Sequence, residues 1–172
     1  MNSHSMKAIK LTLRELIELS LMAALMVGTQ VAMAALPNIN LVSVLIILTV
    51  IVYGAKAFYS VAVFVLLEGL IYGFGLWFIN YLYVWNVLVV IALLLRKNEN
   101  ALIWAVVAGF FGLSFGLLCA IPYLFIGGPG MAVSYWVSGI PFDLTHCVSN
   151  FVLTLALLNP LRKLFIKLRA SV

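Results

Sequence analysis

The sequence has very few charged side chains: ten lysines and arginines and five acidic residues among 172. Hydrophobic residues make up 66% of the chain, which is more apolar surface than a soluble domain of this length can bury. The scarcity of charge therefore excludes an ordinary soluble fold, and we expect the lipid bilayer to be the solvent. The length suits one compact bundle without a second, soluble domain, so residues 1–172 are expected to form a single domain.

Two further absences restrict the chemistry of the chain. No Gly-x-x-x-x-Gly-Lys-Ser/Thr phosphate loop occurs, which excludes ATP hydrolysis by that route. The two cysteines, Cys119 and Cys147, lie in apolar segments, where small buried side chains are expected rather than a disulfide or a metal pair. Residues 1–10 form a basic lead-in, and the apolar stretch that follows is too long for a cleavable signal peptide.

Apolar segments separated by polar, glycine or proline breaks predict an all-α integral membrane bundle of six transmembrane helices. A turn is expected at residues 73–80, and residues 131–138 are expected to form a cap or half-helix across the mouth of the bundle. The second span is short, so it is expected to be tilted or to begin within the preceding turn. The expected spans are residues 11–36, 41–53, 57–73, 81–95, 101–125 and 141–161.

The basic residues all fall on one side of this six-span arrangement. The positive-inside rule then places both termini in the cytoplasm of a multi-pass protein of the cell membrane. The net charge of +5 is explained by attraction to anionic lipid, without a nucleic acid partner. The residues concerned are Lys7, Lys10, Arg14, Lys56, Arg96, Lys97, Arg162, Lys163, Lys167 and Arg169.

The densest group of polar residues lies at the start of the last span. Asp143, His146 and Asn150 are spaced i, i+3 and i+7, so they share one face of a helix. A carboxylate, an imidazole and a carboxamide within a membrane helix are costly unless they face protein, water or a ligand. We therefore expect this face to line a ligand pocket.

Other polar residues are expected at a similar depth, in the outer half of the bilayer. Glu68 follows Lys56 by twelve residues, a rise of about 18 Å in a helix. An intramembrane glutamate indicates a functional site, although a structural hydrogen bond to a neighbouring helix is the alternative. Gln30, the one polar residue deep in the first span, either reaches the pocket or bonds a neighbouring helix.

Aromatic residues follow a helical stripe in the fourth span. Trp77, Tyr81 and Trp85 are spaced i, i+4 and i+8, and Asn86 lies on the adjacent face. The stripe is either an aromatic belt at the membrane interface or a stacking surface for a planar ligand. Together with the polar residues of the other spans, it predicts an outward-opening pocket with aromatic walls and a few polar anchors.

Small residues recur every fourth position in the first span, at Ala24, Gly28 and Ala32. Such a stripe allows another helix backbone to approach closely. The partner is either another span of this chain or a different subunit.

A short chain of six spans, with such a stripe, no ATPase motif and an outer aromatic pocket, resembles the substrate-binding S components of energy-coupling factor (ECF) vitamin transporters. Several segments are similar to a branch of that family in Firmicutes, and together the resemblance covers nearly the whole chain. These segments are Leu36-Pro37-Asn38, Tyr81-Leu82-Tyr83-Val84-Trp85, Pro141-Phe142-Asp143, Thr145-His146 and Ser149-Asn150.

The resemblance implies the substrate-specificity subunit of an ECF-type ABC importer. Such a subunit captures a water-soluble vitamin or precursor outside and associates with a transmembrane coupling subunit and two ATP-binding subunits. The chain would then be no enzyme and would carry no metal or cofactor, because ATP and magnesium bind the partner ATPases. The expected solute is hydroxymethylpyrimidine or a B6 vitamer, with cobalamin as the rival. Ala24, Gly28 and Ala32 would dock on the coupling subunit, although Gly28 is a modest departure from the family motif.

Two other functions remain open. A stand-alone secondary transporter would show inverted internal repeats, and none is convincing in this sequence. A small intramembrane enzyme could use Asp143 and His146 for acid–base or metal chemistry. Two ligand types at i and i+3, however, do not make a metal site without a third and a fourth ligand.

Overall fold

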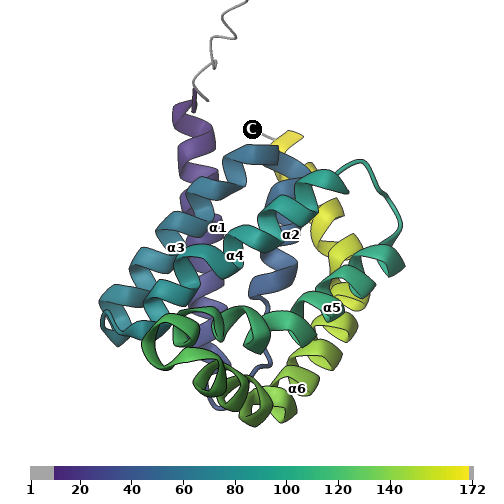
Figure 1. Ribbon diagram of the computed structural model, residues 1–172. Coiled ribbons are helices and arrows are strands. Elements are labelled where there is room, and N and C mark those ends of the chain that lie inside the picture. The colour runs from purple at the N-terminus through teal and green to yellow at the C-terminus, as the bar shows by residue number, and fades with distance from the viewer. Residues whose placement is uncertain (1–9, 171–172) are drawn as a thin grey trace, which may run out of the picture.

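The computed structural model describes residues 10–170, so most of the basic lead-in expected at 1–10, including Lys7, lies outside the described residues. Within that range every regular element is a helix, and there is no strand (Figure 1). The elements are α1 (Leu13–Ala32), α2 (Val42–Tyr53), the 3-10 turn η1 (Gly54–Lys56), α3 (Ala57–Tyr72), α4 (Leu76–Leu94), α5 (Ala101–Cys119) and α6 (Ile121–Ala170).

Four helical segments of the described chain are long and apolar enough to cross a membrane. One of them, residues 42–72, joins α2, η1 and α3 in 31 residues. The all-helical fold is thus confirmed, with four candidate spans, while six spans and cytoplasmic termini stay predictions. The four segments are Leu13–Ala32, Val42–Tyr72, Leu76–Leu94 and Ala101–Cys119.

Local signals in the sequence account for several helix ends. Thr12 caps α1 in a reciprocal arrangement with Glu15, in which each side chain accepts a hydrogen bond from the other residue's backbone N–H. Asn100 caps α5 by accepting from the N–H of Leu102 at 2.9 Å. Gly54 ends α2 with φ of 62°, a conformation that favours glycine, and the chain turns back there into α3.

The expected boundaries are wrong at several places, including the end of the last helix, which was expected near 161 and lies at Ala170. The first helix ends at Ala32 instead of 36. Residues 76–80, expected in a turn, form the first turn of α4, which begins after Gly75. The helix expected over 101–125 ends at Cys119, and a second helix begins two residues later, at the segment that contains Pro122, since proline is accommodated in a first helical turn.

The segment expected as a cap, residues 131–138, is instead a regular part of α6. Among the glycines of Gly127-Gly128-Pro129-Gly130 only Gly128 leaves the helical conformation, with φ of 77° and ψ of −175°. The helix resumes at Pro129, a residue suited to a first helical turn, and continues to Ala170 through Pro141 and Pro160. Only one residue therefore interrupts the helix where the sequence indicated a longer flexible turn.

Helix α2 occupies the middle of the bundle and contacts every other helix. Each of residues 42–50 is buried, which explains why this helix is apolar on all sides. Helices α5 and α6 pack along each other through glycines of α5. A Cβ atom at Gly112 would lie 2.7 Å from the carbonyl carbon of His146, so only glycine permits this approach.

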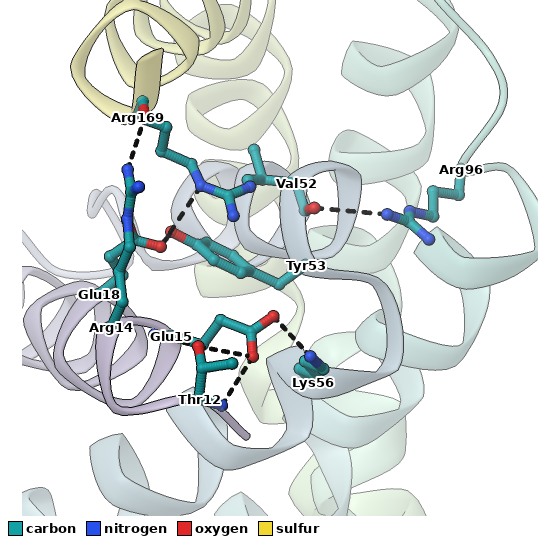
Figure 2. A network of polar contacts seen from close by, with 9 residues as sticks. All are labelled: Thr12, Arg14, Glu15, Glu18, Val52, Tyr53, Lys56, Arg96 and Arg169. Atoms are coloured by element: carbon teal, nitrogen blue, oxygen red, sulfur yellow. Dashed lines mark hydrogen bonds and ion pairs between the residues drawn. The ribbon is translucent and has the colours of Figure 1, made fainter. Parts of the chain in front are cut away.

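The start of α1 and the end of α6 lie at the same end of the molecule (Figure 1). A polar network joins them there to the α2–α3 turn (Figure 2). Arg14 donates to the backbone carbonyl of Arg169 at 2.6 Å, and Lys56 pairs with Glu15. Arg96, beyond α4, donates to the carbonyl of Val52 at 3.3 Å. Basic residues from four separate parts of the sequence therefore gather at this end, which we call the basic end.

Candidate functional site

A hydrogen bond between two membrane helices forms the centre of the candidate site. Because α1 packs against α3, the amide nitrogen of Gln30 reaches the Oε2 atom of Glu68 and donates to it at 2.7 Å. The Glu68 side chain belongs to the interior, since the residue is only 1% exposed. Its other oxygen, Oε1, and the Gln30 Oε1 atom are both buried without a hydrogen-bond partner among the described residues.

These two residues line a hollow of about 380 Å³, called here the Glu68 hollow. Trp77 and Tyr81 of α4 form part of its wall, with ring centroids 5.2 Å apart and an edge-to-face arrangement. The predicted anchors from α1, α3 and α4 therefore come together, and Gln30 both lines the hollow and bonds a neighbouring helix. The full lining is Gln30, Ala34, Glu68, Tyr72, Trp77 and Tyr81.

Trp85 lies one helical turn deeper, in an aromatic cluster behind this wall. It is 1% exposed, so an interfacial aromatic belt does not describe its position. Its ring lies 5.4 Å from that of Tyr81 and 5.4 Å from that of Phe115. Asn86, also predicted as a site residue, is half-buried, and its amide donates to the Leu82 carbonyl of its own helix at 2.7 Å.

Asp143 lies in a different hollow, of about 330 Å³, called here the Asp143 hollow. Its Oδ1 atom accepts the backbone N–H of Gly116 at 2.9 Å. The Oδ2 atom is buried with no partner among the described residues. Tyr135 and Ser138 of α6 and Cys119 of α5 also line this hollow.

His146 and Asn150 are buried on the same face of α6 as Asp143, against α5. The His146 ring lies 5.0 Å from that of Phe115, and neither ring nitrogen has a partner in the described part of the chain. The amide of Asn150 donates to the Ala108 carbonyl at 3.2 Å. The three residues thus share one buried face, as their spacing predicts.

The expected single pocket is divided into two hollows by aromatic side chains. Phe115 lines the Asp143 hollow and contacts Tyr81, Trp85 and His146 through its ring. The division arises because the polar face of α6 packs on the glycines of α5, while the Gln30–Glu68 pair forms between α1 and α3.

Several residues that line the two hollows were not predicted from the sequence, among them two tyrosines. Tyr72 follows Glu68 by four residues in α3, a spacing that places both on one face and that could have identified it. Tyr135 precedes Asp143 by eight residues in α6, but that segment was expected to be a separate cap, so the shared helical face was missed.

The small-residue stripe of α1 is not covered by the described chain. Ala24, Gly28 and Ala32 are all exposed, and a Cβ atom at Gly28 would meet nothing within 4 Å. Packing of the stripe against another described helix of this chain is therefore ruled out, which leaves lipid or a different subunit.

The described residues contain no group of three or more His, Cys, Asp or Glu side chains that could hold a metal ion. Cys119 is buried and Cys147 half-buried, and both are free. Comparison of the chain with protein-family models, with curated proteins and with solved structures finds no match.

Proposed function

We propose that this chain is the substrate-specificity subunit of an ECF-type vitamin importer and that it captures its solute in the Glu68 hollow. The observation that carries the proposal is the Gln30–Glu68 pair, which joins two helices at the wall of an aromatic-lined hollow and leaves one oxygen free on each residue. A buried carboxylate in a membrane helix is costly and is typical of a functional site. A mostly apolar hollow with a few polar anchors is typical of a small-molecule site.

The position of the hollow along the bundle supports capture from outside the cell. Glu68 lies near the end of α3, whereas Lys56 at the basic end immediately precedes the start of that helix. Gln30 likewise lies near the end of α1, far from Arg14 at its start. If the basic end faces the cytoplasm, as the positive-inside rule predicts, the hollow lies in the outer half of the membrane.

The proposed partners are a transmembrane coupling subunit and two ATP-binding subunits, which would bind ATP and magnesium. The uncovered stripe at Ala24, Gly28 and Ala32 supports docking of a partner helix, because small residues allow close backbone contact. The absence of a phosphate loop in the sequence is consistent with an energy source in other subunits.

Affinity purification of the tagged full-length chain from its native membrane tests this proposal. We expect a coupling subunit and two ATPases to co-purify, and mass spectrometry to detect a small vitamin or precursor. Gly28→Leu should abolish co-purification, because the larger side chain blocks close helix contact. The control Val106→Leu, at an exposed apolar position of α5, should retain it. Transport by the purified chain alone would reject the proposal.

A further inference from the structure

Two buried polar atoms of the Glu68 hollow have no partner among the described residues, and they are of one kind. Glu68 Oε1 and Gln30 Oε1 are both acceptors, and the Gln30 amide already donates to the carboxylate. Buried polar atoms in proteins are almost always hydrogen-bonded. The hollow therefore calls for a ligand that donates hydrogen bonds to these two oxygens.

The charge of the hollow points the same way. Its lining contains a carboxylate but no lysine, arginine or histidine. The basic side chains of the described residues gather at the other end of the bundle, where several pair with Glu15, Glu18 and Glu99. A buried charge is strongly destabilising without an opposite charge. The lining supplies no cation to an ionised Glu68, so a bound ligand would have to supply it.

The walls suit a planar, positively charged ligand. Tyr72, Trp77 and Tyr81 all line the hollow, and the faces of such rings attract cations as well as planar groups. The volume of about 380 Å³ lies near the lower limit of roughly 300–1,000 Å³ for small-molecule sites. A single ring matches this space better than a macrocycle such as cobalamin.

We propose that the Glu68 hollow selects a single-ring solute carrying a cationic, N–H-donating nitrogen group, which bonds Glu68 Oε1 and Gln30 Oε1. The inference rests on the proposed function only in that a small solute is bound at this hollow. It excludes solutes whose group at this position is anionic, because a second negative charge would face Glu68.

Two matched series of small molecules test which ligand charge the hollow prefers, with the purified full-length protein. Benzylamine, benzyl alcohol and benzoate share a benzene ring, and pyridoxamine, pyridoxine and 4-pyridoxic acid repeat the comparison on a more highly substituted pyridine ring. Titration calorimetry should give at least about tenfold tighter binding of the amine than of the alcohol, which corresponds to about 1.4 kcal/mol. Equal or tighter binding of the alcohol or the acid, or no binding of either amine, would overturn the proposal.

The Glu68→Gln variant tests whether this carboxylate causes the preference for amine over alcohol, because the substitution keeps the shape of the side chain and removes its charge. The preference for amine over alcohol should fall from about tenfold to less than about threefold, since a neutral acceptor remains. Glu99→Gln is the matched control, because Glu99 is an exposed carboxylate that pairs with Arg162 at the basic end. It should leave the preference unchanged, and an unchanged preference in Glu68→Gln would contradict the assignment.

These measurements are independent of the assembly. The comparison of probes on the unaltered chain needs no substitution, so a Glu68→Gln protein that fails to fold leaves the test intact. An amine preference in a chain that never co-purifies with ATPases would reject the importer assignment but not the ligand class. A chain that co-purifies with ATPases but prefers the acid would reject the ligand class alone.

Discussion

The hydrogen bond from Gln30 to Glu68 joins two helices through their most costly side chains. Glu68 is almost fully buried, and the Gln30 amide is the only described group that bonds its carboxylate. The pair thus combines a structural contact between α1 and α3 with two buried acceptor atoms that have no partner among the described residues.

Gln30→Leu should therefore destabilise the empty protein. The substitution keeps the approximate size of the side chain but leaves both Glu68 oxygens buried and unpaired, at a cost of about 1–3 kcal/mol. A fall in the thermal unfolding midpoint in detergent is the expected measurement. Thr29→Val is the control, because the Thr29 hydroxyl bonds only carbonyls of its own helix. An unchanged midpoint for Gln30→Leu would show that the bond contributes little.

For single residues, the sequence identifies the polar side chains that lie within apolar helices. It predicts less well which residues these side chains contact. Spacing alone placed Asp143, His146 and Asn150 on one face. It did not indicate that glycines of α5 cover this face, since that depends on how two helices pack. The bond of Glu68 to Gln30 could not be predicted either, because the two residues are 38 positions apart and meet only through tertiary contact.

The pairing of α5 with α6 depends on the absence of side chains on one face of α5. Gly109 and Gly112 face Cys147 and His146, and a Cβ atom at either glycine would lie 3.3 Å or less from α6 backbone atoms. The buried polar face of α6 is held in place by this contact, and with it the carboxylate of Asp143 against the N–H of Gly116.

Gly112→Ala should push α5 and α6 apart. The added methyl group would lie 2.7 Å from the His146 backbone, which cannot move as a flexible side chain does, so a loss of about 1–3 kcal/mol is expected. Thermal unfolding measures the effect, and Gly28→Ala is the matched control. With nothing within 4 Å of its Cβ position, that change should be neutral or stabilise the helix by up to about 1 kcal/mol. Equal behaviour of the two variants would contradict the close packing.

A second contact between helices lies at the basic end, where the Glu18 carboxylate of α1 interacts with three side chains. It accepts from the Tyr53 hydroxyl at 2.7 Å and pairs with Arg14 and Arg169 (Figure 2). The network ties the start of α1 to α2 and to the end of α6.

Glu18→Ala should consequently lower stability far more than Glu99→Ala. Hydrogen bonds to charged groups contribute about 1.5–3 kcal/mol, whereas an exposed ion pair such as that of Glu99, whose side chain is 84% exposed, contributes about 0–1 kcal/mol. Unfolding midpoints of the two variants, compared in the same detergent and salt, test this. Similar losses of stability in the two variants would mean that the contacts of Glu18 contribute no more than an exposed ion pair.

Most helices of the described residues were predictable from the apolar segments, but several of their ends were not. The apolar segments predicted the start of α5 at Ala101 and that of α1 to within two residues, and they left residues 54–56 as the connection after α2. The errors fell where glycine and proline cluster. At residues 127–130 only Gly128 adopts a left-handed φ, and the sequence does not distinguish it from the neighbouring glycines.

For the whole molecule, the distribution of charge gives the bundle two unlike ends. Arg14, Lys56, Arg96 and Arg169 gather at one end, and the α3–α4 connection lies at the other (Figure 1). The sequence predicts this separation because the charged residues recur at alternate breaks between apolar segments. Which end faces the cytoplasm follows only from the positive-inside rule and is open to direct measurement.

Single cysteines at the two ends would report the orientation in intact cells. After Cys119 and Cys147 are replaced by alanine, Lys97→Cys places a thiol at the basic end and Phe74→Cys places one in the α3–α4 connection, both at exposed positions. A membrane-impermeant maleimide should label Phe74→Cys directly but label Lys97→Cys only after the cells are permeabilised, because the lysine- and arginine-rich end is expected inside. The reverse pattern would place the Glu68 hollow on the cytoplasmic side, where it could not capture a solute from outside. Labelling of both thiols in intact cells would mean that the two ends do not lie on opposite sides of the membrane.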